Sequence, residues 1–109
     1  MHNCFWTNAR SRIAYQYFGD VVIFDATYQT NTYKMPFVPF TGVNHHYQSV
    51  MFGCALLVNE IVESYTWLLK TWLSAMLGNP PSTIITNDDK AMAKAIANVL
   101  HNATHRLCM

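Results

Sequence analysis

The spacing of apolar residues changes once along this chain of 109 residues, near Glu60. Before that point, apolar and β-branched residues stand in short runs, at residues 21–24, 37–43 and 50–58. Such runs are typical of β-strands. From there on, over residues 61–76, apolar residues recur at three- and four-residue steps, as they do on one face of a helix. The chain therefore combines strands and helices, which predicts an α/β fold.

The elements after this helix alternate between strand and helix. Gly78 and the prolines that follow it end the first helix, and residues 83–86 form a short β-branched run. A second helix is predicted over residues 92–100, and a last strand over residues 104–108. The predicted order is β-β-β-α-β-α-β, in which the first strands pair antiparallel and the helices cross over to further, parallel strands.

Four local features make this prediction specific. The run at residues 21–24 is continuously apolar, which indicates a strand that is buried on both faces. Pro36 and Pro39 withhold backbone donors and place the second strand at an edge or a bulge. Asn59 is the expected N-cap of the first helix. Residues 1–19 show no sustained period and form a poorly defined N-terminal segment.

Composition narrows the class of protein further. Charged residues make up 12% of the chain, aromatic residues 14%, and the formal net charge is +1. This balance is unlike that of a disordered tail or a strongly basic nucleic-acid-binding surface. Three scattered cysteines fit a reducing compartment, and the longest apolar run, residues 50–58, is far shorter than a membrane span. We expect one soluble intracellular domain with no membrane partner.

Acidic and amide residues follow two of the predicted strands. Asp25 comes directly after residues 21–24, and Asn87, Asp88 and Asp89 come directly after residues 83–86. Carboxylates that converge from separate strand ends are what a two-magnesium phosphoryl-transfer site needs. The same residues have a structural interpretation, in which Asp25 opens a turn and Asp88 or Asp89 caps the second helix. Order and spacing alone leave both interpretations open.

Motifs along nearly the whole chain resemble those of one known family. They are Phe5-Trp6, Ala9-Arg10-Ser11-Arg12, Phe18-Gly19-Asp20-Val21-Val22, Phe24-Asp25-Ala26-Thr27-Tyr28, Asn31-Thr32-Tyr33-Lys34-Met35-Pro36, Gly42-Val43-Asn44-His45-His46, Phe52-Gly53-Cys54-Ala55-Leu56-Leu57, the segment 86–92 and His105-Arg106-Leu107-Cys108. The chain is similar to Mutator-like element (MULE) transposase domains. It most resembles the plant FAR-RED IMPAIRED RESPONSE and FAR-RED ELONGATED HYPOCOTYL proteins derived from them. The resemblance implies that residues 20–109 form a partial ribonuclease-H-like MULE domain, truncated at its C-terminus.

The resemblance also implies roles for the acidic residues. Family members carry an Asp-Asp-Glu triad that binds magnesium, and Asp25 stands at the position of the first acid. Asn87 stands at the position of the second, where it brings no negative charge. Asp88 is the substitute ligand, although neighbours on an extended strand point to opposite sides. The third acid would lie beyond Met109. We therefore expect magnesium in the ancestral enzyme and no functional cofactor here.

The function implied by the resemblance is that of a transposase-derived nuclear protein that regulates transcription, without catalytic activity. DNA binding would belong to the full-length protein and to a separate zinc-binding domain, with weak binding by this chain alone. His105 and Cys108 do not complete a zinc site. Homo- or hetero-oligomers with family members are the expected assemblies. The alternative is an active transposase core fragment that cleaves and joins DNA with magnesium, and a third interpretation is a gene-model product that does not fold stably.

Two further groups of residues have structural interpretations. Adjacent His45 and His46 face opposite ways in an extended segment, so we predict a turn over residues 44–48 and no metal site. Trp67 and Trp72 are expected in a core or an interface.

The expected truncation predicts exposed apolar surface. Without the missing layer, Phe52, Leu56 and the helix that carries Trp67 and Trp72 would lie uncovered, which would lead the chain to associate or unfold partly.

Overall fold

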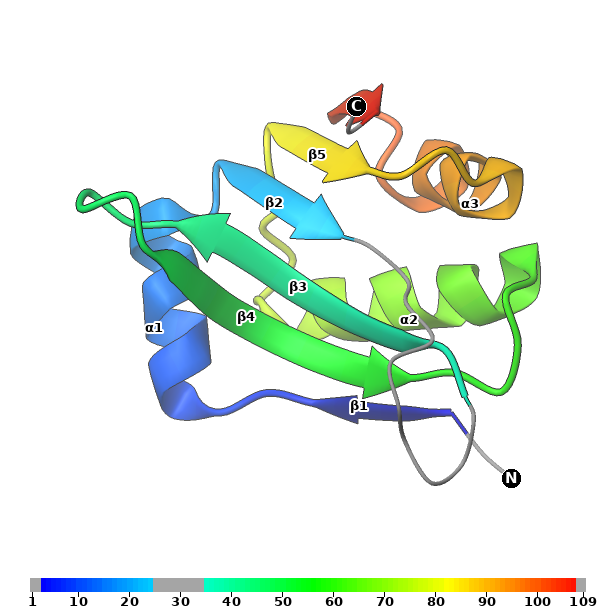
Figure 1. Ribbon diagram of the computed structural model, residues 1–109, viewed down its shortest axis with the longest axis horizontal. Helices are drawn as coiled ribbons and strands as arrows, with labels where there is room; N and C mark the ends of the chain where they lie inside the picture. Colours follow the sequence, from blue (N-terminus) through cyan, green and yellow to red (C-terminus); the bar gives the residue numbers. More distant parts are fainter. Residues whose placement is uncertain (1–2, 25–34, 108–109) are drawn as a thin grey trace.

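The computed structural model describes residues 3–24 and 35–107, so Asp25 and Cys108 lie outside the described residues. The described part is a mixed α/β fold of one six-stranded sheet and three helices (Figure 1). In chain order the elements are β1 (Cys4–Trp6), α1 (Ala9–Phe18), β2 (Val21–Phe24), β3 (Phe37–Val43), β4 (Ser49–Leu56), α2 (Val62–Ala75), β5 (Thr83–Thr86), α3 (Lys90–Val99) and β6 (Thr104–Leu107).

The sheet has the strand order β1-β4-β3-β2-β5-β6. Its β1–β4, β4–β3 and β3–β2 pairs are antiparallel, whereas β2–β5 and β5–β6 are parallel. The antiparallel pair predicted before Glu60 and the parallel strands predicted after the helices are both confirmed. This order places β2 and β5 beside each other, and both are interior strands of the sheet.

The connection between β3 and β4 is a tight turn, as predicted. The amide of Asn44 donates to the carbonyl of Gln48 at 3.0 Å, and the side-chain oxygen of Asn44 accepts from the amides of His46 and Gln48. Tyr47 has a positive φ of 58°. The asparagine side chain thus takes up the backbone donors of the turn, which fixes the register of the hairpin.

A bulge interrupts the β3–β4 pairing beside Gly53. Phe40 pairs with Gly53 but Thr41 pairs with Met51, so the register shifts by one residue. A Cβ on Gly53 would lie 3.1 Å from the carbonyl oxygen of Trp6 on β1. Gly53 therefore marks both a bulge and a close backbone approach, the two outcomes that an isolated glycine in a strand indicates.

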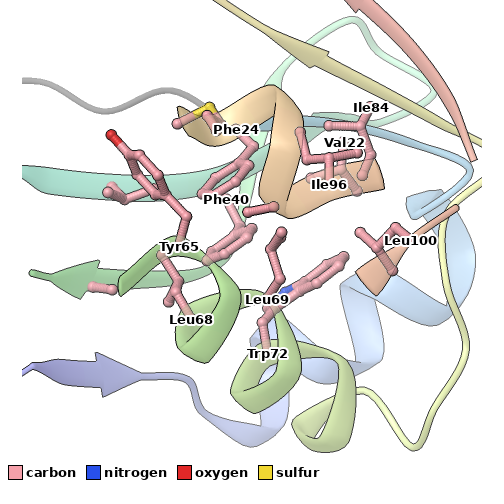
Figure 2. Packing of buried hydrophobic residues seen from close by; sticks show 14 of the residues in the cluster. Val22, Phe24, Phe40, Tyr65, Leu68, Leu69, Trp72, Ile84, Ile96 and Leu100 are labelled. Atoms are coloured by element: carbon pink, nitrogen blue, oxygen red, sulfur yellow. The ribbon is translucent and has the colours of Figure 1, made fainter. Parts of the chain in front are cut away.

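All three helices pack against the same face of the sheet, where they share one apolar core. Its centre is a stack of three aromatic rings, with Phe24 on Phe40 at 4.7 Å and Phe40 on Trp72 at 4.8 Å between ring centroids. Tyr15 of α1 meets the Trp72 ring edge-on at 5.2 Å. Figure 2 shows α2 and α3 enclosing these rings against β2, β3 and β5. The apolar residues that recur with helical spacing after Glu60 thus form the core face of α2.

The other face of the sheet carries no helix among the described elements, and we call it the open face. Residues paired across the strands point the same way, so the register assigns its members. They are Cys4, Trp6, Val21, Ile23, Phe37, Pro39, Thr41, Val43, Ser49, Met51, Cys54, Leu56, Thr83, Ile85, Thr104 and Arg106. The prediction that β2 is buried on both faces is wrong for the described residues. Val22 and Phe24 are buried, but Val21 is 44% exposed on the open face.

The N-terminal segment folds as β1 and α1, although its sequence shows no sustained period. The Asn8 side chain caps α1 by accepting from the Ser11 amide at 2.8 Å. Within α1 only Tyr15 is buried, and β1 has three residues. A helix with one buried residue and a strand of three residues leave no repeating pattern in the sequence, which explains why neither was predicted.

Of the two alternatives predicted for Pro39, an edge or a bulge, the bulge is confirmed, and the predicted cap of α2 needs correction. Pro39 does not lie at an edge, because β3 is an interior strand between β4 and β2. In the described residues β2 pairs with β3 only at Thr41 and Phe40, so Pro39 lies beyond that paired stretch, next to the bulge. Asn59 does not cap α2. The N-cap is Ile61, and the side-chain oxygen of Asn59 accepts instead from the Ser64 hydroxyl at 2.5 Å.

The predicted exposure is wrong for two of the side chains it named, Phe52 and Trp72. Phe52 and Trp72 are both 0% exposed, because α1 and α2 close over β3 and β4. Trp67 is 38% exposed on the outer side of α2. Among the exposed large apolar side chains, Trp6, Val21, Val43 and Met51 lie on the open face of the sheet. In the described ranges no helix is long and apolar enough to cross a membrane.

Candidate functional site at the carboxyl ends of β2 and β5

The two strands that precede the acidic and amide residues lie side by side. Val22 pairs with Ile84 and Ile23 with Ile85 in parallel register. β2 ends at Phe24 and β5 at Thr86, so the chain leaves both strands at the same edge of the sheet. This edge of a parallel sheet is where ligands of α/β proteins usually bind. Asp25 follows β2 in the sequence, but it lies outside the described residues.

Asn87 is the first residue after β5, and its side chain is partly enclosed. The side-chain oxygen Oδ1 is buried and has no hydrogen-bond partner within residues 3–24 and 35–107. Its backbone carbonyl accepts from the Thr86 hydroxyl at 2.9 Å and from the Asp89 amide at 3.0 Å. Position 87 therefore holds a neutral carbonyl oxygen at the strand end, where the sequence resemblance led us to expect the position of the second acid.

The carboxylate of Asp89 accepts hydrogen bonds from two helices, α2 and α3. Its Oδ1 accepts from the amides of Ala91 and Met92, at 2.9 and 3.2 Å, and so caps α3. Its Oδ2 accepts from the Tyr65 hydroxyl of α2 at 3.0 Å. The prediction that Asp89 caps the helix is confirmed. Both carboxylate oxygens are used in the structure, which makes Asp89 a poor metal ligand.

Asp88 lies between these two residues and is exposed. Its role as a substitute for Asn87 stays a prediction. Over the described part of the chain, no group of three histidine, cysteine, aspartate or glutamate side chains is placed to hold a metal ion. These residues by themselves do not fit a two-magnesium site. They offer one neutral oxygen and one exposed carboxylate.

A contact that the sequence did not indicate joins β6 to this edge. The Thr86 hydroxyl lies 2.6 Å from Nε2 of His105. The Thr86 hydroxyl and Nε2 of His105 are thus hydrogen-bonded between β5 and β6, and the tautomer of His105 sets which of the two donates. Thr86 is fully buried. His105 is therefore used within the sheet, and no spacing of residues in the sequence signals this pair.

A cavity with a volume of about 410 Å³ lies elsewhere, between α1 and the end of α2. In its wall the Tyr15 hydroxyl donates to the carbonyl of Asn79 at 2.5 Å. Burial, and to a lesser degree the Asp20 carboxylate, raise the pKa of Tyr15 to about 12. Tyr15 stays a neutral donor at physiological pH, so it ties α1 to the chain after α2. This role is structural, and the strand ends remain the candidate site.

The described residues form an α/β domain in which two parallel strands end side by side, and the comparisons with known proteins give its family. The family model described as the MULE transposase domain matches residues 21–109. The chain belongs to the MULE transposase domain family.

Its curated relatives are plant proteins. The chain is 47% identical to Protein FAR1-RELATED SEQUENCE 5 of Arabidopsis thaliana over 97% of its own length and 14% of that protein. It is 46% identical to Protein FAR-RED IMPAIRED RESPONSE 1 of the same plant, over 96% of its length and 13% of the relative. The chain thus spans about one seventh of the length of these relatives. No solved structure matches it.

Proposed function

We propose that this chain is the inactive, transposase-derived core of a nuclear protein that regulates transcription, and that it acts as a structural or protein-interaction core. The observation that carries the proposal is the neutral Asn87 at the end of β5, beside the end of β2. Magnesium binds hard, charged oxygen ligands, and an amide oxygen in place of a carboxylate lowers the affinity.

The surrounding contacts support this proposal because the residues beside Asn87 hold the fold together. Asp89 caps α3 and binds Tyr65. Thr86 and His105 are engaged with each other between β5 and β6. When a site loses one acid while its neighbours hold the fold together, the domain can stay stable without catalytic activity.

The strand order supports a ribonuclease-H-like architecture as part of the proposal. Leaving β1 aside, three antiparallel strands open the fold, and the first of them, β2, then pairs in parallel with β5, which follows α2. That is the order the family resemblance implies, and it brings the positions after β2 and β5 to one edge. Regulation of transcription, nuclear location and DNA binding by a longer protein are parts of the same proposal.

The second candidate function is an active core that cleaves and joins DNA strands. The exposure of Asp88, one residue after Asn87, favours it, because a rearranged turn would bring that carboxylate toward the strand ends. In this alternative Asp25 and Asp88 hold magnesium together with an acid from outside this chain.

A plasmid-nicking assay with magnesium separates the two functions. We expect no nicking by the purified chain, and none by the Asn87→Asp variant alone, because two carboxylates leave two metal ions under-coordinated. Asp25→Ala is the matched control. Nicking by the unaltered chain that disappears in Asp25→Ala would refute the inactive core and establish the alternative.

A further inference from the structure

The cavity between α1 and the end of α2 combines apolar and oxygen-bearing residues. Its volume of about 410 Å³ falls within the range of small-ligand pockets, roughly 300–1,000 Å³. Ile13 and Leu77 belong to its apolar lining. Asp20 and the hydrogen-bonded pair of Tyr15 and Asn79 belong to its polar lining. A lining of this kind suits an aliphatic chain that ends in a polar group.

Two helices reach this cavity with their C-terminal ends. Gly19, which follows the last residue of α1, lines the cavity, and so do Ala75 and Met76 at the end of α2. The carbonyl end of a helix carries a partial negative charge, which favours a cation nearby. Within the described ranges of both helices, no basic side chain occupies the last turn. The two helix ends therefore favour a positive charge that comes from elsewhere.

The carboxylate of Asp20 adds a full negative charge at the same place. Its backbone carbonyl accepts from the amides of Ser82 and Thr83, at 2.9 and 3.0 Å, which fixes the position of this residue. Its side chain is exposed and has no hydrogen-bond or ion-pair partner among residues 3–24 and 35–107. Because its charge contributes to the raised pKa of Tyr15, the carboxylate lies near the Tyr15 hydroxyl.

Arg12 lines the same cavity without neutralising this end. It stands about two helical turns before Gly19, which separates the two residues by about 10 Å along the axis of α1. Exposed charges are largely screened beyond about 8 Å at physiological ionic strength. In the part of the chain that the structure describes, Arg12 and Asp20 form no ion pair. The end of the cavity at Asp20 thus keeps its negative charge.

The oxygen atoms at this end suit an organic cation better than a metal ion. One carboxylate is the only charged ligand there, and no group of three histidine, cysteine, aspartate or glutamate side chains is placed to hold a metal ion within the described ranges. A guanidinium or an ammonium group brings several donors, which the Asp20 carboxylate and the Asn79 carbonyl can accept. The apolar wall suits the aliphatic stem of such a group.

Exposed apolar side chains beside the cavity favour a protein segment over a free amine. Leu77 is 78% exposed and Ile13 is 54% exposed. Leu77 also has a φ of 60°, and backbone strain of this kind is often kept where it serves a function. A free amine would fill only the cavity, whereas apolar residues that flank a basic residue in a polypeptide would also cover these two side chains.

We propose that this cavity binds a basic side chain of a partner protein, with the charged group at Asp20 and flanking apolar residues on Ile13 and Leu77. The inference rests on the part of the proposed function that makes this chain a protein-interaction core. It does not depend on metal binding at the strand ends, because the cavity lies elsewhere in the fold.

An NMR titration of the full chain with a model peptide tests the proposal. The probe is an acetylated and amidated pentapeptide that carries arginine at its centre and leucine on each side of it. We expect saturable chemical-shift changes at the cavity residues. Binding should weaken at least about tenfold when citrulline, a neutral analogue, replaces the arginine. This comparison uses only the unaltered chain, so it is independent of the folding of any variant.

Two variants locate the binding site. Asp20→Asn should weaken binding of the arginine peptide at least about tenfold, whereas the matched control Glu63→Gln, which removes a carboxylate from the first turn of α2, should leave it unchanged. Leu77→Asn should weaken the peptide about threefold, since it removes an apolar contact, and leave unchanged any binding of agmatine, a free amine with the same guanidinium group. Circular dichroism shows whether each variant is folded.

Each contrary result has a distinct meaning. Equal binding of the arginine and citrulline peptides, or full binding by a folded Asp20→Asn variant, would overturn the cation site. Agmatine that bound as tightly as the peptide would assign the cavity to a free amine and overturn the protein partner. If the peptide did not bind and the chain did not nick DNA, this inference alone would fail. Nicking that Asp25→Ala abolishes would instead count against the proposed function.

Discussion

The Tyr65 hydroxyl donates a hydrogen bond of 3.0 Å to the Asp89 carboxylate, and the same carboxylate caps α3. The two helices that cover the parallel half of the sheet are thus joined at one side chain, two residues after Asn87. Tyr65 also meets the ring of Phe24 edge-on at 6.3 Å, so it reaches the last described residue of β2. One small cluster therefore holds the ends of β2 and β5 and the start of α3.

Substitution of Asp89 should separate its capping role from its charge. Asp89→Ala removes the cap and the acceptor for Tyr65, and should lower the free energy of unfolding by about 2 kcal/mol. Asp89→Asn should cost much less, because asparagine caps helices about as well as aspartate. Urea unfolding of both variants measures the difference. Equal losses would mean that the negative charge matters more than the hydrogen bonds.

Tyr15 should make the domain unstable at high pH. Its folded-state pKa is raised to about 12, whereas an unfolded tyrosine has the ordinary value of about 10. The unfolded chain loses this proton first, so stability is fully present below pH 10 and falls as the pH rises toward 12. Over this pH range the free energy of unfolding of the unaltered chain should fall by on the order of 2 kcal/mol more than that of the Tyr15→Phe variant.

The control for this prediction is Tyr17→Phe, because Tyr17 lies on the same helix and is 74% exposed. Its pH dependence of unfolding should match that of the unaltered chain. If Tyr15→Phe also left the alkaline loss unchanged, Tyr15 would not be the group responsible.

The end of α2 holds strain that one substitution should relieve. Leu77 has a φ of 60°, a region that is unfavourable for a bulky side chain, and it is 78% exposed. Leu77→Asn should raise the free energy of unfolding by about 0.5–1 kcal/mol, since asparagine tolerates this conformation and little burial is lost. Thermal unfolding measures the gain.

Gly78 provides the opposite change in the same turn. Its φ is 77°, and a Cβ added there would meet no atom within 4 Å. Gly78→Ala should therefore destabilise the domain through backbone conformation alone, by about 1 kcal/mol. A neutral result for both variants would show that this turn adapts without strain.

The sequence predicts an element well where a single residue within it makes the contact that defines the element. The β3–β4 turn follows from the Asn44 side chain, the end of α2 from Gly78, and the cap of α3 from Asp89. In each case the residue itself makes the contact that defines the element.

The rest depends on tertiary contacts that no local pattern contains. α1 buries only Tyr15, whose ring packs on Trp72 from another part of the chain. The apolar run of β2 predicts two buried faces, but only one is covered by described elements, so sequence could not place Val21. At the candidate site, the interpretation of Asn87 as the position of the second acid comes from the resemblance and stays a prediction. The Thr86–His105 contact arises from strand pairing over a separation of nineteen residues.

Metal binding tests the central claim, that the neutral side chain at position 87 disables the site, most directly. Titration calorimetry with Mn²⁺ and Mg²⁺ should show that Asn87→Asp binds at least about tenfold more tightly than the unaltered chain, a difference of about 1.4 kcal/mol. Asp25→Asn added to that variant should remove the gain. If the unaltered chain bound these ions as tightly as Asn87→Asp, and Asp25→Asn abolished that binding, the site would be intact and the account wrong.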